Sequence, residues 1–127
     1  MSPPKRVLFV DDKKEVCEMV KILLNALGCE ARTATNWEQA LALVGSEHFD
    51  LYILDLIFPD GSGLELCRKI RKFDSQTPLI FYSAYTAQVT QYMIDAAGAQ
   101  ASVLKTGGFE ELQENIARLI GGTDGDQ

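Results

Sequence analysis

Short apolar runs alternate with segments of helical periodicity along the whole chain, and this alternation restricts the fold more than any other feature. The pattern of a strand followed by a helix occurs five times, with no internal repeat, low-complexity tract or linker. Strands that are apolar throughout are typical of a parallel sheet covered by helices on both faces. The sequence therefore predicts a layered α/β fold.

The predicted elements can be placed by residue type. Strands are expected at Arg6–Val10, Glu30–Thr33, Asp50–Leu54, Pro78–Tyr82 and Ser102–Leu104. Apolar residues at helical spacing predict helices around Val16–Leu27, Ala40–Val44, Leu66–Ile70, Thr86–Ala97 and Phe109–Ile120. Asn36 is expected to cap the second helix, with Gln39 completing a capping box. The Pro- and Gly-rich segment 58–63 is expected to be a turn.

Right-handed crossovers between these strands give a flavodoxin-like, doubly wound (βα)5 sandwich, whose five-stranded parallel sheet has the order 2-1-3-4-5. With 127 residues and 46% apolar content, the chain is long enough to bury one core. We expect a single domain over residues 1–127 with its core at 5–120, and a polar, glycine-rich tail at 121–127 that frays.

Composition excludes several classes of function. The net charge is −6 and the basic residues form no stripe, which disfavours direct binding to nucleic acid or to an anionic membrane. No apolar stretch is long enough to span a bilayer, and no signal-peptide core follows the N-terminus, so a cytoplasmic chain is expected. Cys17, Cys29 and Cys67 form no C-x-x-C pair, and we expect reduced thiols that are packing or surface residues.

Residues able to handle metal or phosphate follow four of the predicted strands. Asp11 and Asp12 follow the first, Asp55 the third, Ser83 the fourth and Lys105 the fifth. The carboxyl ends of parallel strands share one edge of the sheet, and the order 2-1-3-4-5 places strands 1 and 3 side by side. These side chains should therefore meet in one crevice.

Three carboxylates without a His or Cys ligand favour Mg²⁺. Asp55 beside a metal can act as a nucleophile toward phosphorus, and Ser83 and Lys105 can bind phosphoryl oxygens. Taken singly, each residue has another interpretation: Asp11 and Asp12 as a solvated loop and helix cap, Ser83 as a turn residue, Lys105 as a surface lysine. No such simple interpretation suits Asp55, because a carboxylate that follows a buried strand needs a cation beside it.

At these positions the chain resembles the receiver domain of two-component response regulators. The resemblance covers about Lys5 to Ile120 and is carried by Val10-Asp11-Asp12, by Leu-Asp-Leu-Ile-Phe-Pro-Asp-Gly-Ser-Gly at 54–63, by Ser83-Ala84 and by Lys105. It implies that Asp55 accepts a phosphoryl group from a phosphohistidine on a sensor histidine kinase or a histidine phosphotransfer protein, in a reaction that the receiver catalyses. It also implies that Asp12, Asp55 and the carbonyl of Ile57 coordinate Mg²⁺, with Asp11 acting directly or through water, and that Ser83 and Lys105 contact the phosphoryl oxygens.

Two positions depart from the family pattern. Proline usually follows the lysine, but Thr106 stands here, so the loop after the last strand is expected to differ. An aromatic residue usually lies three positions before the lysine and moves inward on activation, but Ser102 occupies that place. The usual aromatic switch is therefore in doubt, with Tyr85 or Phe81 as candidate substitutes.

Ile57 and Tyr85 stand at the two positions that border the path of hydrolytic water in the family. An apolar group and a ring there should shield an acyl phosphate from water, which predicts slow self-dephosphorylation. His48 is expected in a solvated loop far from the crevice, and Trp37 is expected to pack at a helix start.

The leading hypothesis is a signalling module controlled by phosphorylation. It would catalyse only its own phosphotransfer and dephosphorylation, and so would not be an enzyme in the usual sense. Phosphorylation would switch partner binding through the face made by the fourth helix, fifth strand and fifth helix. Its output would lie in a downstream protein partner or in an output domain fused to the receiver. One alternative is a Mg²⁺-dependent aspartyl phosphohydrolase, although Ile57 occupies the place where such enzymes often carry a second acid. The other is a receiver-like domain that docks proteins without phosphate, which the changes at Ser102 and Thr106 leave open.

Overall fold

A five-stranded parallel sheet forms the centre of the protein, in a computed structural model that describes residues 3–84 and 91–120. Its strands are β1 (Arg6–Val10), β2 (Glu30–Ala34), β3 (Leu51–Leu54), β6 (Leu79–Ser83) and β7 (Ala101–Leu104). They lie in the order β2-β1-β3-β6-β7, and every neighbouring pair is parallel. The predicted order 2-1-3-4-5 and the doubly wound α/β fold are confirmed.

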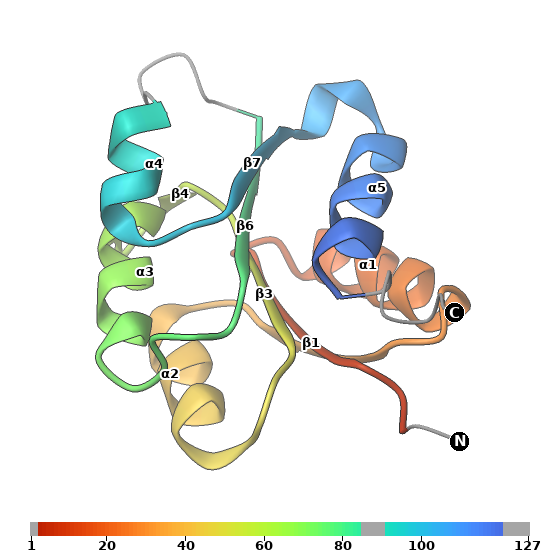
Figure 1. The fold of residues 1–127 in the computed structure, drawn as a ribbon, viewed down its shortest axis with the longest axis horizontal. Coiled ribbons are helices and arrows are strands. Elements are labelled where there is room, and N and C mark those ends of the chain that lie inside the picture. The colour runs from red at the N-terminus through yellow and green to blue at the C-terminus, as the bar shows by residue number, and fades with distance from the viewer. Residues whose placement is uncertain (1–2, 85–90, 121–127) are drawn as a thin grey trace.

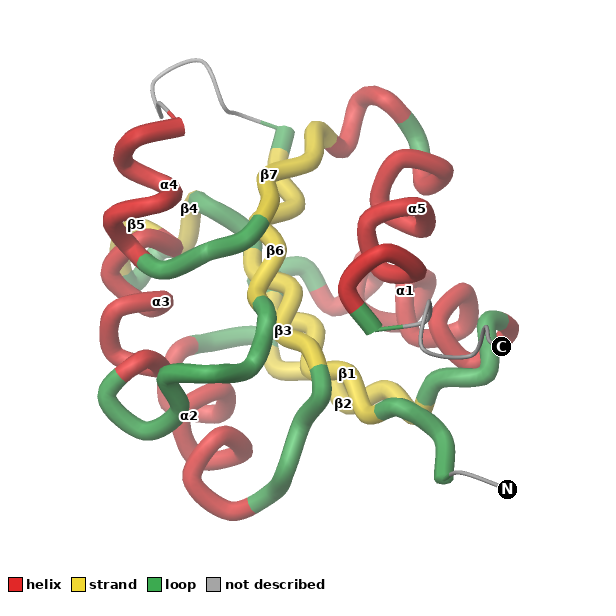
Figure 2. Tube along the Cα trace, viewed as in Figure 1, coloured by secondary structure: helices red, strands yellow, loops and turns green. Residues whose placement is uncertain are grey.

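Helices cover both faces of the sheet (Figure 1). The helices are α1 (Lys14–Ala26), α2 (Trp37–Ser46), α3 (Gly63–Arg71), α4 (Gln91–Ala97) and α5 (Phe109–Leu119). Helices α2, α3 and α4 lie on one side, and α1 and α5 lie on the other. Figure 2 shows the strands as one layer between these two helical layers.

Alternate residues of each central strand supply two separate cores. In β1, Leu8 and Val10 join the cluster under α2, α3 and α4, whereas Val7 and Phe9 join the cluster under α1 and α5. All four side chains are fully buried. This period of two within an apolar run is what a strand buried on both faces requires.

Side-chain caps fix where two helices begin. Asn36 Oδ1 accepts the backbone N–H of Gln39 at 2.9 Å, as predicted, but Gln39 Oε1 accepts the N–H of Thr35 instead of returning to Asn36. A full capping box starts α3, where Ser62 Oγ accepts the N–H of Leu64 at 3.1 Å and Glu65 Oε1 accepts that of Ser62 at 3.4 Å. This second box was not predicted, although Ser62 and Glu65 have the required spacing.

The turn predicted at 58–63 contains a small hairpin. Strand β4 (Ile57–Phe58) pairs antiparallel with β5 (Gly61–Ser62), with Ile57 opposite Ser62 and Phe58 opposite Gly61. After β7 the chain makes one turn of 3₁₀ helix, η1 (Lys105–Gly107), with a trans peptide bond before Thr106. Tyr85, the first residues of the helix predicted at 86–97, and the tail at 121–127 lie outside the described residues. Within the described parts of the chain, no helix is long and apolar enough to cross a bilayer.

The turn between α3 and β6 is built around Asp74. One carboxylate oxygen accepts the N–H groups of Gln76 and Thr77, each at 3.1 Å, and the other accepts the hydroxyls of Thr77 and Tyr52 at 2.5 and 2.8 Å. Partial burial acts to raise the pKa of this carboxyl, but the hydrogen bonds outweigh it and lower the pKa to about 2.

We predict that Asp74→Asn destabilises the protein at neutral pH and that the difference disappears in acid. The folded pKa lies below that of an unfolded Asp, so the stabilisation is present above about pH 4 and is lost as the pH falls toward 2. Because the carboxylate borders solvent, we expect a difference of about 1 kcal/mol at pH 7. Urea unfolding of both proteins between pH 2 and 7 measures it, and a constant difference across that range would contradict the assignment.

Candidate functional site

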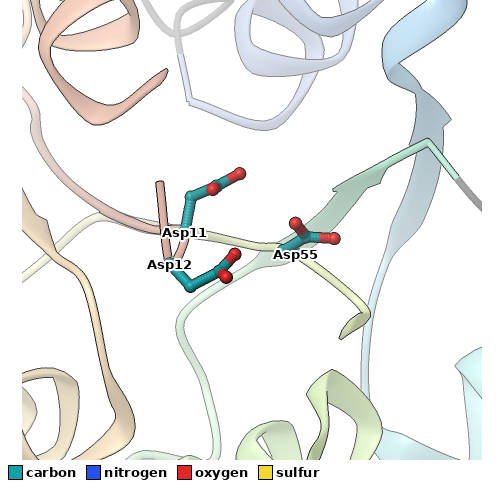
Figure 3. A group of neighbouring side chains, drawn as sticks. All are labelled: Asp11, Asp12 and Asp55. Atoms are coloured by element: carbon teal, nitrogen blue, oxygen red, sulfur yellow. The ribbon is translucent and has the colours of Figure 1, made fainter. Parts of the chain in front are cut away.

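Three carboxylates gather at the carboxyl edge of the sheet, as predicted. Asp11 and Asp12 follow β1 and Asp55 follows β3, and the direct pairing of these strands brings them together (Figure 3). One carboxylate oxygen of each residue lies within 4.8 Å of those of the other two. Asp11 and Asp55 are buried and Asp12 is half-buried. The cluster offers only oxygen ligands, the kind that Mg²⁺ prefers.

Backbone hydrogen bonds hold both buried acids in place. The N–H of Asp11 donates to Ala34 O and that of Asp55 donates to Val10 O, each at 3.1 Å, which extends the ladders beyond the strands. Asp11 Oδ1 accepts the N–H of Lys13 at 2.9 Å, and Asp55 Oδ1 accepts that of Leu56 at 2.7 Å. Two of the carboxylates are therefore oriented before any ligand binds.

Lys105 supplies the cation that a buried carboxylate requires. Its Nζ is paired with Asp11 Oδ2 and lies 3.2 Å from Asp55 Oδ2. Burial acts to lower the pKa of Lys105, but the hydrogen bond and charge of Asp11, followed by the charge of Asp55, outweigh it and raise the pKa. The ammonium is thus charged at neutral pH. Lys13 Nζ lies 3.7 Å from Asp12 Oδ1, so two ammonium groups face three carboxylates, which leaves an excess of negative charge.

Ser83 and Ile57 border the same cleft as Asp12 and Asp55. The cleft has a volume of about 460 Å³, and its lining includes Asp12, Asp55, Ile57, Ser83 and Lys105. Ser83 ends β6 and is buried, whereas the Ile57 side chain at the mouth is 53% exposed. The structure therefore brings together all the residues predicted for the site. The shielding predicted for Ile57 with Tyr85 stays a prediction, because Tyr85 lies outside the described residues.

Gly63 is a site residue that was predicted only as part of a turn. Its N–H donates to Leu56 O at 2.7 Å, which joins the start of α3 to the segment that follows β3 and contains Asp55. A Cβ at position 63 would lie 2.0 Å from Asp55 O and 2.9 Å from Leu56 Cα. Only glycine permits this approach of two backbones, and it could have been suspected from its place at the end of the loop that follows Asp55.

Other residues singled out in the sequence lie outside the cluster of acids. His48 is 79% exposed beside Asp50, in the loop before β3 and so at the opposite end of that strand from Asp55. Cys17, Cys29 and Cys67 are free thiols, and burial, followed by the charge of Asp11, raises the pKa of Cys17 to about 11. Cys17 Sγ donates to Asp11 O at 3.3 Å, so this thiol packs beneath the site in neutral form.

Comparison with known proteins decides the family. The family model for the response regulator receiver domain matches residues 7–117. The chain belongs to the response regulator receiver family. The resemblance drawn from Asp11, Asp12, Asp55, Ser83 and Lys105 is therefore confirmed at the level of the family, which consists of signalling modules of two-component systems.

Similar proteins include both full-length regulators and isolated receivers. The chain is 34% identical to the response regulator protein PilR of Pseudomonas aeruginosa over 116 residues, which are 91% of this receiver and 26% of PilR. It is 33% identical to the transcriptional regulatory protein TrcR of Mycobacterium tuberculosis, over 93% of this receiver and 45% of TrcR. This receiver thus spans between a quarter and a half of the length of these relatives.

Solved structures confirm the fold. The response regulator TrrA of Thermotoga maritima, in complex with Mg²⁺ and BeF, has a TM-score of 0.83 and 37% identity, covering 91% of this chain and 99% of that one. The chemotaxis response regulator CheY4 of Vibrio cholerae has a TM-score of 0.85 and 28% identity, covering 92% and 99%. In both, the likeness extends over nearly the whole receiver.

We predict that Gly63→Ala destabilises this receiver by about 1–3 kcal/mol, the usual cost of overpacking, because the new methyl group must push the Asp55 backbone away. Gly45→Ala in α2 is the matched control. A Cβ at position 45 would contact nothing within 4 Å, so this change should stabilise the helix by about 0.5–1 kcal/mol. Urea unfolding gives both values, and equal effects of the two substitutions would show that the approach at Gly63 is unimportant.

Proposed function

We propose that this receiver is a phosphoacceptor in which Asp55 takes a phosphoryl group from a phosphohistidine and the chain itself catalyses the transfer. A carboxylate oxygen of Asp55 forms the new bond to phosphorus as the phosphorus–nitrogen bond of the donor breaks, and the imidazole nitrogen keeps the electron pair and takes up a proton. The observation that carries the proposal is the arrangement around Asp55: two further carboxylates cluster with it, the Lys105 ammonium lies 3.2 Å from it, and Asp12, Asp55 and Lys105 line one cleft.

The residues of the site fit a bound Mg²⁺ ion. Asp11, Asp12 and Asp55 place oxygen atoms within 4.8 Å of one another, and the two ammonium groups of Lys105 and Lys13 do not balance the charge of the three carboxylates. We assign the ion to Asp12, Asp55 and the carbonyl of Ile57, with Asp11 acting directly or through water. When bound, Mg²⁺ would neutralise part of the charge on the phosphoryl oxygens. The TrrA structure, a complex with Mg²⁺ and BeF, supports the assignment by analogy.

Lys105 and Ser83 would bind the oxygens of the transferring group. The Lys105 ammonium already lies 3.2 Å from Asp55 Oδ2, so its charge is in place where negative charge arrives. Ser83 offers a hydroxyl from the end of the neighbouring strand β6 within the same cleft. Both groups stand on the edge of a rigid sheet, and this reduces the reorganisation needed when the phosphoryl group arrives.

The alternatives find less support at the site. A phosphohydrolase that uses Asp55 as nucleophile would benefit from a second acid two residues later, and Ile57 offers only an apolar side chain there. A docking domain that works without phosphate has no need for three carboxylates clustered with a lysine, since burying charged groups costs free energy. We therefore place phosphoacceptance first.

The partners follow from this role. We propose a sensor histidine kinase or a histidine phosphotransfer protein as donor, in the cytoplasm, and a downstream partner or a fused output domain as receiver of the signal. The lengths of PilR and TrcR, of which this chain matches only part, are consistent with receivers joined to further domains in those proteins. A single receiver domain over residues 1–127 stays a prediction.

Phosphorylation of Asp55 is tested with a small phosphodonor and Mg²⁺. We expect the intact mass of the protein to increase by one phosphoryl group, and we expect no increase in Asp55→Asn or when Mg²⁺ is chelated. Asp95→Asn, which removes an exposed carboxylate from α4, is the control and should react like wild type. If wild type and Asp55→Asn gave the same mass under all conditions, the proposal would be wrong and phosphate-independent docking would be favoured.

Lys105→Met separates phosphoryl transfer from metal binding. We predict that phosphorylation slows by about 10²–10³-fold, the usual effect of removing one preorganised charge donor from a reaction centre. Mg²⁺ should bind at least as tightly as in wild type, because Asp11 and Asp55 lose the ammonium that competes with the metal. Stopped-flow phosphorylation and calorimetric Mg²⁺ titration measure the two effects. Weaker Mg²⁺ binding with an unchanged phosphorylation rate would contradict the role given to Lys105.

A further inference from the structure

The single tryptophan of the chain contacts the hairpin that follows Asp55. Trp37 is the first residue of α2, and its ring meets that of Phe58 edge to face, with centroids 6.4 Å apart and planes at 74°. Phe58 lies in β4 and is buried. The backbone N–H of Trp37 also donates to Asp60 Oδ2 at 3.3 Å. Two contacts therefore join the start of α2 to the hairpin β4–β5.

The hairpin is shaped to admit the indole ring. Gly61 has a φ angle of +152°, and a Cβ at this position would lie 2.9 Å from Cη2 of Trp37. The indole Nε1 is buried and finds no hydrogen-bond acceptor among the described residues. A buried donor without an acceptor costs free energy, so the position of the ring is set by its packing against the hairpin and not by a polar contact.

Ile57 lies between two attachments of this hairpin. On one side, the N–H of Gly63 donates to Leu56 O at 2.7 Å. On the other side, Phe58 and Gly61 face each other across the hairpin. The ring of Phe58 contacts that of Trp37, and the backbone of Gly61 lies close to the same indole. The backbone of Ile57 is thus held from the start of α3 and from α2 at the same time.

We propose that Trp37 is a positioning residue for the Mg²⁺ site. Its indole fixes the β4–β5 hairpin and thereby the backbone of Ile57, whose carbonyl is the third protein ligand. This inference rests on the proposed function, which places Mg²⁺ at these residues. Groups that hold metal ligands in place commonly control affinity although they never touch the ion. Trp37 would act here by packing instead of by a hydrogen bond.

The test compares Mg²⁺ affinity with stability in three variants. Trp37→Ala removes the indole, and we expect the dissociation constant for Mg²⁺ to rise by about 10-fold, the lower end of the range for residues that orient ligands. Trp37→Phe keeps a ring against Phe58 and should recover most of the affinity. Leu43→Ala is the matched control, because Leu43 packs in the same core from α2 but lies in the second half of that helix and outside the hairpin. It should lower the unfolding temperature and leave the Mg²⁺ dissociation constant unchanged.

Titration of the backbone amide resonances of residues 57, 58 and 60–63 with MgCl₂ gives the dissociation constant without any phosphorylation step. If wild type showed no Mg²⁺ binding at all, the proposed function itself would fail. If wild type bound Mg²⁺ and folded Trp37→Ala bound it equally well, only the role of Trp37 would fail. Should Trp37→Ala not fold, Gly61→Ala decides, because its methyl group displaces the indole from the hairpin side. An unchanged dissociation constant in that variant would overturn the inference.

Discussion

The site depends on one electrostatic balance: the positive charge of the Lys105 ammonium offsets the negative charge of two buried carboxylates, those of Asp11 and Asp55. A buried carboxylate without a cation costs several kcal/mol, and here two such groups share one lysine. Lys105 comes from the end of β7, two strands away from Asp55 in the sheet. The pairing of Asp11, Asp55 and Lys105 therefore requires that β1, β3, β6 and β7 be complete and in register.

The register of the central strands is what delivers the acids to one edge. Val10 pairs with Leu54, so Asp11 and Asp55 both leave the sheet at the same level. A shift of one residue in either strand would turn its apolar side chains to the opposite face and its acid away from the cleft. The two separate cores, which take alternate residues of β1, oppose such a shift. The hydrophobic effect thus fixes the geometry of a polar site.

Sequence reasoning predicted the elements whose signal is local or periodic. The five strands, their order and the convergence of Asp11, Asp12, Asp55, Ser83 and Lys105 follow from apolar runs and from the topology that they require. The hairpin β4–β5 was not predicted, because two residues per strand carry no periodicity. The close approach of Gly63 to Asp55 and the contact of Trp37 with Phe58 are tertiary facts that no local pattern in this chain encodes. The capping box of Ser62 and Glu65 could have been predicted from their spacing in the sequence, but it was not.

The same balance suggests how a phosphoryl group would alter the protein. In the structure Lys105 is shared between Asp11 and Asp55, and each holds one of its hydrogen bonds. A phosphoryl group on Asp55 would bring more negative charge than the carboxylate it replaces, so Lys105 would be drawn away from Asp11. Lys105 also begins η1, which leads directly into α5. Because Ser102 and Thr106 stand in place of the family's usual aromatic and proline, movement of Lys105 itself would link the cleft to the α5 side of the sheet. Lys105 would then serve both phosphoryl transfer and transmission of the signal. Phosphorylation would disturb the same electrostatic balance that stabilises the unphosphorylated site.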